Sequence, residues 1–136
     1  IVPGISSSIA APMYAGIPLT HRDYASSVAI ITGHQAGEGN KKIDWAKIID
    51  SVDTLVILMG LESLSTIVNK LLSGGVQLSK PVAIIENGTS KQQRSVIGTL
   101  ATIVEDVKRL EIKSPAVIVI GEVVKLGRKL TWFKTN

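Results

Sequence analysis

The sequence of 136 residues contains no cysteine, which excludes disulfides, thiolate metal sites and thiol nucleophiles from this chain. Aromatic residues contribute only 4%, so the apolar content, 45% in total, consists mainly of Ile, Val, Leu and Ala. No apolar run reaches the roughly 18 residues that a membrane-spanning helix needs. These absences indicate a soluble, cytoplasmic protein with an aliphatic core and no association with a membrane.

Charge of one sign is only slightly in excess: 15 Lys and Arg residues against 11 Asp and Glu residues give a formal net charge of +4. A nucleic-acid-binding protein usually concentrates its basic residues on one face or helix. Here they are scattered along the chain, and no glycine-aromatic RNA-binding motif accompanies them. We therefore expect no nucleic-acid partner, whereas a small polyanionic substrate is compatible with the charge.

Nearly continuous aliphatic runs predict four β-strands, at residues 27–32 (SVAIIT), 54–59 (TLVILM), 81–85 (PVAII) and 116–120 (AVIVI). Such runs are typical of strands that helices cover on both faces. Helical patterns lie between these strands, at residues 43–51, 61–72 and 92–110. The alternation predicts a layered α/β/α domain with a mostly parallel or mixed sheet, over residues 26–136.

The two ends of the chain are less regular. Residues 6–16 are small and apolar and predict a short helix, within an interdomain connection that we assign to residues 1–25. Residues 123–133 could form a last strand and its return, and the pattern leaves their direction open. Because the chain starts at Ile1 without methionine or a signal-peptide pattern, we expect it to be part of a longer protein.

Each predicted strand is followed by a glycine, at Gly33, Gly60, Gly88 and Gly121. If the sheet is largely parallel, these glycines lie near one edge, where open α/β sheets bind ligands and where glycine permits close approach to the backbone. The same glycines could simply end the strands. The pattern alone indicates a ligand-binding α/β domain, and a non-catalytic module that binds a nucleotide-like ligand or a partner protein stays open.

Three residues are candidates for acid, base or metal chemistry. His21 and His34 are far apart in the sequence, and no third ligand is evident, so we expect no metal site. His21 is expected to anchor its segment by hydrogen bonds, and His34 the end of a strand. Glu86, at a strand end, could be a general base, but an ion-paired or backbone-capping role is the more common one.

A series of short motifs, in order along almost the whole chain, resembles the tetrapyrrole methylase family, and within it the uroporphyrinogen-III C-methyltransferases. The motifs are VPGISS (residues 2–7), AGIPLTHR (15–22), TGH (32–34), TLVILMG (54–60), PVAIIENGT (81–89), QQR (92–94), GTL (98–100), SPA (114–116) and GEVV (121–124). Members of this family have two α/β domains with the active site between them. The resemblance implies that this chain is the C-terminal half, one wall of the cleft, and lacks the N-terminal domain with its GGDP loop.

The resemblance also implies the roles of individual residues. Arg22 would bind the carboxylates of the substrate, since guanidinium is a permanent bidentate partner for carboxylate. Met59 would contact both cofactor and substrate, and no catalytic residue is assigned within this chain. The cofactor-binding residues would be Ser6, Ser7, Met59, Gly88, Pro115 and Ala116, with Pro115 and Ala116 beside the adenine.

The implied reaction is methylation of uroporphyrinogen III at C2 and C7 by S-adenosyl-L-methionine, which gives precorrin-2 for sirohaem and cobalamin biosynthesis. The family is homodimeric, so we expect a homodimer. Other members methylate later corrinoids or the diphthamide precursor, and such a substrate is an alternative. Because the GGDP loop and the family's catalytic groups are missing, we expect this chain to be inactive alone.

Overall fold

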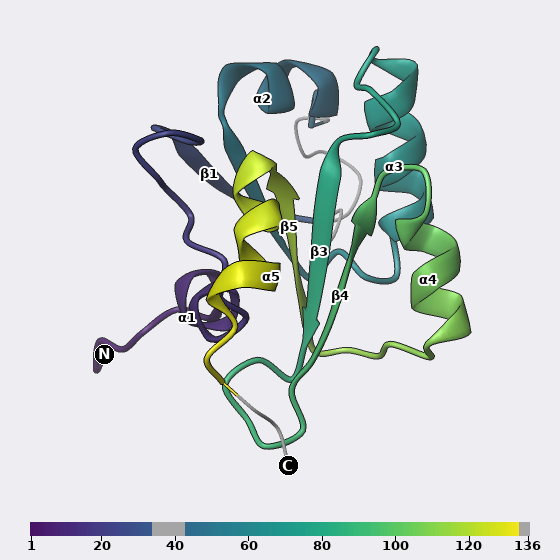
Figure 1. Cartoon of the computed structure of the whole chain (residues 1–136). Coiled ribbons are helices and arrows are strands. Elements are labelled where there is room, and N and C mark those ends of the chain that lie inside the picture. The colour runs from purple at the N-terminus through teal and green to yellow at the C-terminus, as the bar shows by residue number, and fades with distance from the viewer. Residues whose placement is uncertain (34–42, 134–136) are drawn as a thin grey trace.

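The computed structural model describes residues 1–33 and 43–133, so His34 lies outside the described residues. Five strands form one sheet in the order β1-β2-β5-β3-β4, and helices lie on both sides of it (Figure 1). The strands are β1 (Val28–Thr32), β2 (Thr54–Leu58), β3 (Pro81–Glu86), β4 (Arg94–Thr99) and β5 (Ala116–Gly121). The predicted layered α/β/α domain is therefore confirmed.

The sheet is mixed. β1 and β2 are parallel, whereas β5 is antiparallel to both of its neighbours, β2 and β3, and β4 is antiparallel to β3. Strands β1, β2 and β3 consequently end at the same end of the sheet, and β4 and β5 begin there (Figure 1). We call this the carboxyl end of the sheet, after β1 to β3.

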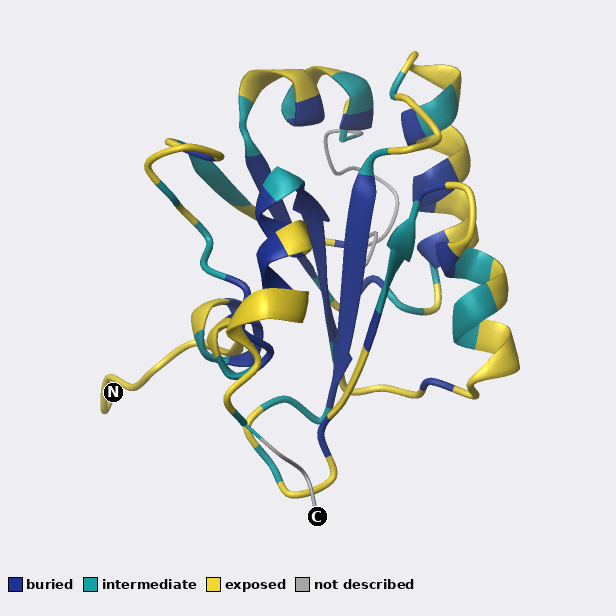
Figure 2. Cartoon of the chain, viewed as in Figure 1, coloured by how far each residue is buried: buried dark blue, intermediate teal, exposed yellow. Residues whose placement is uncertain are grey.

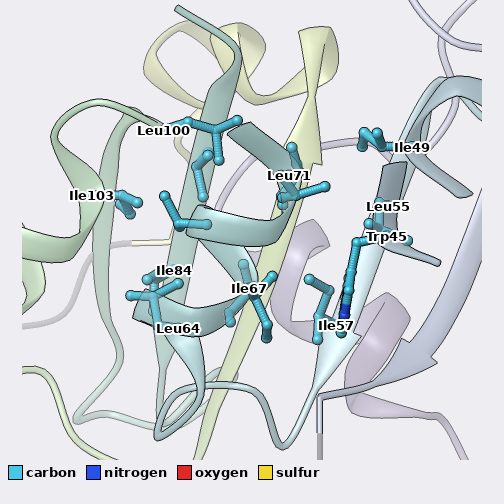
Figure 3. Packing of buried hydrophobic residues seen from close by; sticks show 14 of the residues in the cluster. Trp45, Ile49, Leu55, Ile57, Leu64, Ile67, Leu71, Ile84, Leu100 and Ile103 are labelled. Atoms are coloured by element: carbon cyan, nitrogen blue, oxygen red, sulfur yellow. The ribbon is translucent and has the colours of Figure 1, made fainter. Parts of the chain in front are cut away.

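One face of the sheet is covered by α2 (Trp45–Ser51), α3 (Leu64–Ser73) and α4 (Ile103–Arg109). In α3, buried apolar residues recur at spacings of three and four, so one side of the helix packs on the strands. Figure 3 shows this cluster, in which side chains of α3 lie between those of β2 and β3. Its largest members include Trp45, Ile49, Leu55, Ile57, Leu64, Ile67, Leu71, Ile84, Leu100 and Ile103.

The opposite face is covered by α1 (Ser7–Tyr14), by the 3-10 helix η1 (Glu122–Leu126) and by the short helix α5 (Gly127–Leu130). The alternate residues of the same strands point to this side, so β3 is buried along its whole length (Figure 2). Ala11 of α1 and Ile17 after it belong to this second core cluster. The chain returns to α1 after α5, where the indole N–H of Trp132 donates to the carbonyl of Met13 (3.1 Å).

The predicted helix at residues 92–110 is wrong in its first half, because residues 94–99 form β4 and only 103–109 are helical. The spacing of Val96, Leu100 and Ile103 is that of a helix, but Val96 belongs to β4 and is buried as a strand residue. β-Branched residues favour a strand, and Gly98 would weaken a helix. Pairing with β3 along six register positions supplies the hydrogen bonds that an isolated helix would have made internally.

Of the two sheet types expected, mostly parallel or mixed, the structure has the mixed one, and the expectation that all four glycines lie near one edge is wrong. Gly33 and Gly60 follow β1 and β2, and Gly88 lies just after β3, at the carboxyl end of the sheet. Gly121 ends the antiparallel β5 and lies opposite Thr54, where β2 begins. Residues 122–130 are helical, which excludes the last strand considered for residues 123–133.

Candidate functional site

A cavity of about 600 Å³ opens at the carboxyl end of the sheet. It lies between the ends of β2 and β3, the beginning of β5, the first turn of α1 and the start of the segment that leads into α3. Four of the predicted site residues line it, and these come from three separate parts of the chain: Ser7, Met59, Pro115 and Ala116. The remaining lining residues are Leu58, Leu61, Glu62, Ile85, Ser114 and Val117.

Met59 has an unusual backbone. It follows β2 directly, its φ is 52°, and the residue is largely exposed (68%) at the wall of the cavity. A non-glycine residue in this left-handed region costs about 1–3 kcal/mol, and such residues cluster at functional sites. Gly60 after it is buried, and a Cβ there would lie 2.8 Å from Ile57 Cγ2, so the position directly after Met59 has no room for a side chain. Met59 itself is left facing solvent at the cavity.

Ser6 and Ser7 lie at the start of α1. Ser6 is the N-cap: its hydroxyl accepts from the backbone N–H of Ser8 (3.3 Å) and lies 2.7 Å from the hydroxyl of Ser8. The Ser6 side chain is therefore engaged in starting the helix, whereas Ser7 is exposed and lines the cavity. Of the predicted pair, only Ser7 lies at the cavity wall.

Pro115 is the last residue of the segment that leads from α4 into β5, and Ala116 is the first residue of β5. The carbonyl of Pro115 accepts from the backbone N–H of Asn87 (3.0 Å). Two residues earlier, the backbone N–H of Lys113 donates to the carboxylate of Glu86 (2.9 Å). These bonds attach this wall of the cavity to the end of β3.

Glu86 is buried and ion-paired, as its more common role predicted. Its carboxylate accepts from Nε of Arg94, directly opposite it on β4, and from Lys113. The hydrogen bond from Arg94 is the main reason why the pKa of Glu86 is lowered, against the opposing effect of burial. These donors hold the Glu86 carboxylate in its charged form, which suits a structural role rather than that of a general base. Glu86 also does not line the cavity.

Gly88 is not among the lining residues. A Cβ added there would lie 2.4 Å from Cβ of Ala11 and 3.0 Å from its Cα, so the glycine is required by the close packing of α1 against the turn after β3. This contact fixes the position of α1, and hence of Ser7, relative to β3. A direct role of Gly88 in binding a cofactor stays a prediction.

Arg22 lies away from this cavity. It is exposed in the tight turn between His21 and Ala25, on the connection from α1 to β1. That connection is attached at the opposite end of β2, where Asp53 accepts hydrogen bonds from Ser26 and Ser27. The structure does not bring Arg22 and Met59 together, and the role of Arg22 stays a prediction.

His21 has the local role expected of it, since its Nδ1 accepts from the backbone N–H of Asp23 (3.2 Å). Among residues 1–33 and 43–133, no group of three His, Cys, Asp or Glu side chains is arranged to hold a metal ion. Within the same residues no helix is long and apolar enough to cross a membrane. The expectation for His34 concerns a residue that is not described.

The sequence patterns missed the polar lining residues Glu62 and Ser114 and the apolar Leu61. Each is within a few positions of a residue that the family resemblance had identified, and this adjacency was the available signal. A second hollow of about 670 Å³ lies between α2 and α3, lined by Asp44, Trp45 and Lys70 among others. It contains none of the predicted site residues.

Comparison with known proteins agrees with the sequence motifs. The family described as Tetrapyrrole (Corrin/Porphyrin) Methylases matches residues 1–104. The chain is 48% identical to a uroporphyrinogen-III C-methyltransferase of Bacillus subtilis over 137 residues, which cover all of this chain and 28% of that protein. It is 44% identical to the porphyrin biosynthesis protein HemD of Ruminiclostridium josui, over 98% of this chain and 26% of that protein.

Solved structures give the same result. The uroporphyrin-III C-methyl transferase of Thermus thermophilus, complexed with S-adenyl homocysteine, superposes with a TM-score of 0.73 and 32% identity. The match covers 93% of this chain and 53% of that one, so this chain spans about half of the solved enzyme and about a quarter of the curated relatives. With the family match extending over most of its length, the chain belongs to the tetrapyrrole (corrin/porphyrin) methylases.

Proposed function

We propose that the protein containing this chain methylates uroporphyrinogen III at C2 and C7 with S-adenosyl-L-methionine, giving precorrin-2. The observation that carries the proposal is the cavity at the carboxyl end of the sheet. Residues that the family resemblance assigns to the cofactor, distant in sequence, line it together: Ser7, Met59, Pro115 and Ala116. Relatives at 44–48% identity bear names from this pathway.

The walls suit an adenosyl ligand. A volume of about 600 Å³ is within the range of small-molecule sites, and the lining is largely apolar with a few polar groups. Pro115 and Ala116 offer flat, small apolar surface for a purine ring. Met59 offers a polarizable thioether, which packs beside a sulfonium without a charge to repel it.

The methyl donor supplies an electrophilic methyl group on sulfur, and the substrate supplies the carbon nucleophile. The task of this chain is to hold the two in line, since orientation accounts for much of the rate of such a transfer. Met59, exposed at the end of β2, would lie between the two ligands.

Arg22 is proposed to bind a carboxylate of the tetrapyrrole from outside the cavity. It is exposed, and among the described residues no salt bridge joins it to Asp or Glu. A free guanidinium is suited to an octacarboxylate substrate. Because Arg22 lies away from the cavity, this contact requires a substrate that extends well beyond the methyl-transfer point.

We further propose that this chain forms one wall of the active site and that a second domain forms the other. The solved relative is about twice as long as the matched region, which leaves room for such a domain. The homodimer expected for the family belongs to the same proposal.

The test is turnover by the full-length protein with uroporphyrinogen III and S-adenosyl-L-methionine, followed by the absorbance of the methylated products. Formation of precorrin-2 supports the proposal. Binding of S-adenosylhomocysteine without turnover of uroporphyrinogen III would point to another tetrapyrrole. A full-length protein that binds neither ligand would contradict the proposal and favour a non-catalytic binding module.

A further inference from the structure

One charged network lies directly behind the cavity wall without touching the cavity. Arg94, on the edge strand β4, donates through Nε to the buried carboxylate of Glu86 on β3. The other two nitrogens of its guanidinium donate to the carbonyls of Leu110 (3.0 Å) and Glu111 (2.9 Å). One planar group thus ties the sheet to the end of α4.

Besides this network, the segment from α4 to β5 is attached by a few backbone hydrogen bonds: Glu111 and Ile112 donate to carbonyls of α4, and the carbonyl of Pro115 accepts from Asn87. Between the end of α4 and the start of β5, residues 110–115 contain one buried side chain, Ile112. Glu111 has a φ of 50°, a conformation that costs a non-glycine residue free energy and needs support from its surroundings. The carbonyl of Glu111 accepts one of the hydrogen bonds from Arg94, and this bond supplies such support.

The same network extends to the cavity wall through Glu86. The second oxygen of its carboxylate accepts from the backbone N–H of Lys113, and Ser114, Pro115 and Ala116 follow immediately as lining residues. The side chain of Glu86 is only 5% exposed, so its carboxylate is held in one place by the two donors. Arg94 therefore acts on both ends of the wall segment, on its carbonyls directly and on Lys113 through Glu86.

We propose that Arg94 is a positioning residue for the adenosyl pocket: with Glu86 it holds residues 110–116 so that Pro115 and Ala116 meet the adenine. The proposal rests on the proposed function, since it assigns the adenosyl group to this wall. Arg94 itself does not line the cavity. When the hydrogen bonds of the Arg94 guanidinium are lost, residues 110–116 are no longer held in place. The affinity for adenosyl ligands then falls, while the contacts to the tetrapyrrole are unchanged.

The experiment uses the full-length protein and three variants. Arg94→Gln removes the charge and two of the three tethers, and Arg94→Lys keeps the charge but, with a compact ammonium, cannot span the carboxylate and both carbonyls. Arg109→Gln is the matched control, since it breaks an Arg–carboxylate pair with Asp106 on α4 (2.7 Å) without touching the wall. Hydrogen exchange of residues 110–116 and calorimetry with S-adenosylhomocysteine are measured for each.

We expect Arg94→Gln to raise the Kd for S-adenosylhomocysteine about tenfold or more, because binding must then order a released wall, and each loss of about 1.4 kcal/mol raises Kd tenfold. Exchange at Lys113 should accelerate, KM for uroporphyrinogen III should stay unchanged, and Arg94→Lys should recover part of the affinity. The control should have wild-type exchange and affinity. Arg94→Lys keeps a cation beside Glu86, so it carries the test if Arg94→Gln does not fold.

Three outcomes overturn the proposal. Folded Arg94 variants with wild-type Kd and wild-type exchange would refute it, and so would equal losses in the Arg109→Gln control. If the wild-type protein binds no S-adenosylhomocysteine at all, the proposed function fails and this proposal with it. If the wild-type protein binds S-adenosylhomocysteine and the Arg94 variants have the same Kd and exchange, the positioning role fails but the proposed function does not.

Discussion

The contact between Gly88 and Ala11 allows a quantitative test of how α1 is attached to the sheet. In Gly88→Ala the new Cβ would lie 2.4 Å from Cβ of Ala11, which real structures do not tolerate, so α1 must shift. Forcing a methyl group into a packed core costs about 1–3 kcal/mol. The neighbouring atom belongs to a buried helical residue rather than to a flexible side chain, so we expect about 2 kcal/mol, in the middle of that range.

The complementary substitution, Ala11→Gly, removes the obstructing methyl group. By itself it costs about 1 kcal/mol in helix propensity and about 0.8 kcal/mol for a lost buried methyl group. In the double variant the methyl group on residue 88 occupies the space that the one on residue 11 has left, with only the Ala11 Cα still close at 3.0 Å. The double variant should therefore be about 1–2 kcal/mol more stable than the sum of the single effects, within the range of contacting pairs.

The assay is a double-mutant cycle in urea, with the free energy of unfolding measured for the wild type and the three variants. Gly4→Ala is the matched control, because nothing lies within 4 Å of a Cβ at Gly4, and its effect should stay within about 0.5 kcal/mol. Affinity for S-adenosylhomocysteine should fall in Gly88→Ala, since Ser7 moves with α1, and recover in the double variant. Additive free energies would refute the reasoning that these two residues are in direct contact.

Four further outcomes are expected. Met59→Lys should weaken binding of S-adenosylmethionine more than of S-adenosylhomocysteine in calorimetry, because only the former carries a sulfonium charge, and equal losses would contradict the placement of Met59. Arg22→Ala should lower kcat/KM for uroporphyrinogen III by a factor corresponding to about 1.5–3 kcal/mol without changing cofactor affinity, and a loss of cofactor affinity would refute the assignment to substrate. The carboxylate of Asp53 accepts hydrogen bonds from the backbone and hydroxyl groups of Ser26 and Ser27, which lower its pKa from 3.8 to about 2. These bonds contribute fully to stability above pH 4, and the contribution is lost as the pH falls toward 2. Asp53→Asn should therefore flatten that part of the acid-unfolding curve. The purified 136-residue chain should not form precorrin-2 from uroporphyrinogen III, and turnover by it would contradict the need for a second wall.

Four of the five strands could be predicted from the sequence because each is a nearly continuous aliphatic run: β2, β3 and β5 are buried, and β1 has such a run although it lies at an edge of the sheet. β4 lies at the edge of the sheet, and its exposed first residues, Arg94 and Ser95, interrupt any such run. Val96, Leu100 and Ile103 then have the spacing of a helix by coincidence, since a strand, a turn and a helix start each contribute one of them. Pairing with β3 decides between strand and helix for residues 94–99, and the periodicity of the sequence carries no information about that pairing.

The site was accessible to sequence reasoning only through the family resemblance. Composition gives no reason to combine Met59 with Pro115, which approach each other because β2 and β5 are neighbours. Conversely, the resemblance gave no indication that Gly88 packs against α1. The structure places Ala11 against it, a contact between residues that no local pattern connects, and Gly88 does not line the cavity.

The direction of β5 has a consequence for the site that a parallel sheet would not have had. Had β5 run parallel to β2, its glycine, Gly121, would have reached the cavity and Pro115 would have lain at the far end of the sheet. Because β5 is antiparallel, its first residues lie beside the last residues of β2 and β3, with Val117 opposite Leu58 and also opposite Ile85. The cavity is therefore bounded by two strands that end and one that begins, and a loop leading into a strand supplies its third wall. Such a loop is not fixed by a strand that precedes it, which is why its position depends on contacts made behind the cavity, from Glu86 and Arg94.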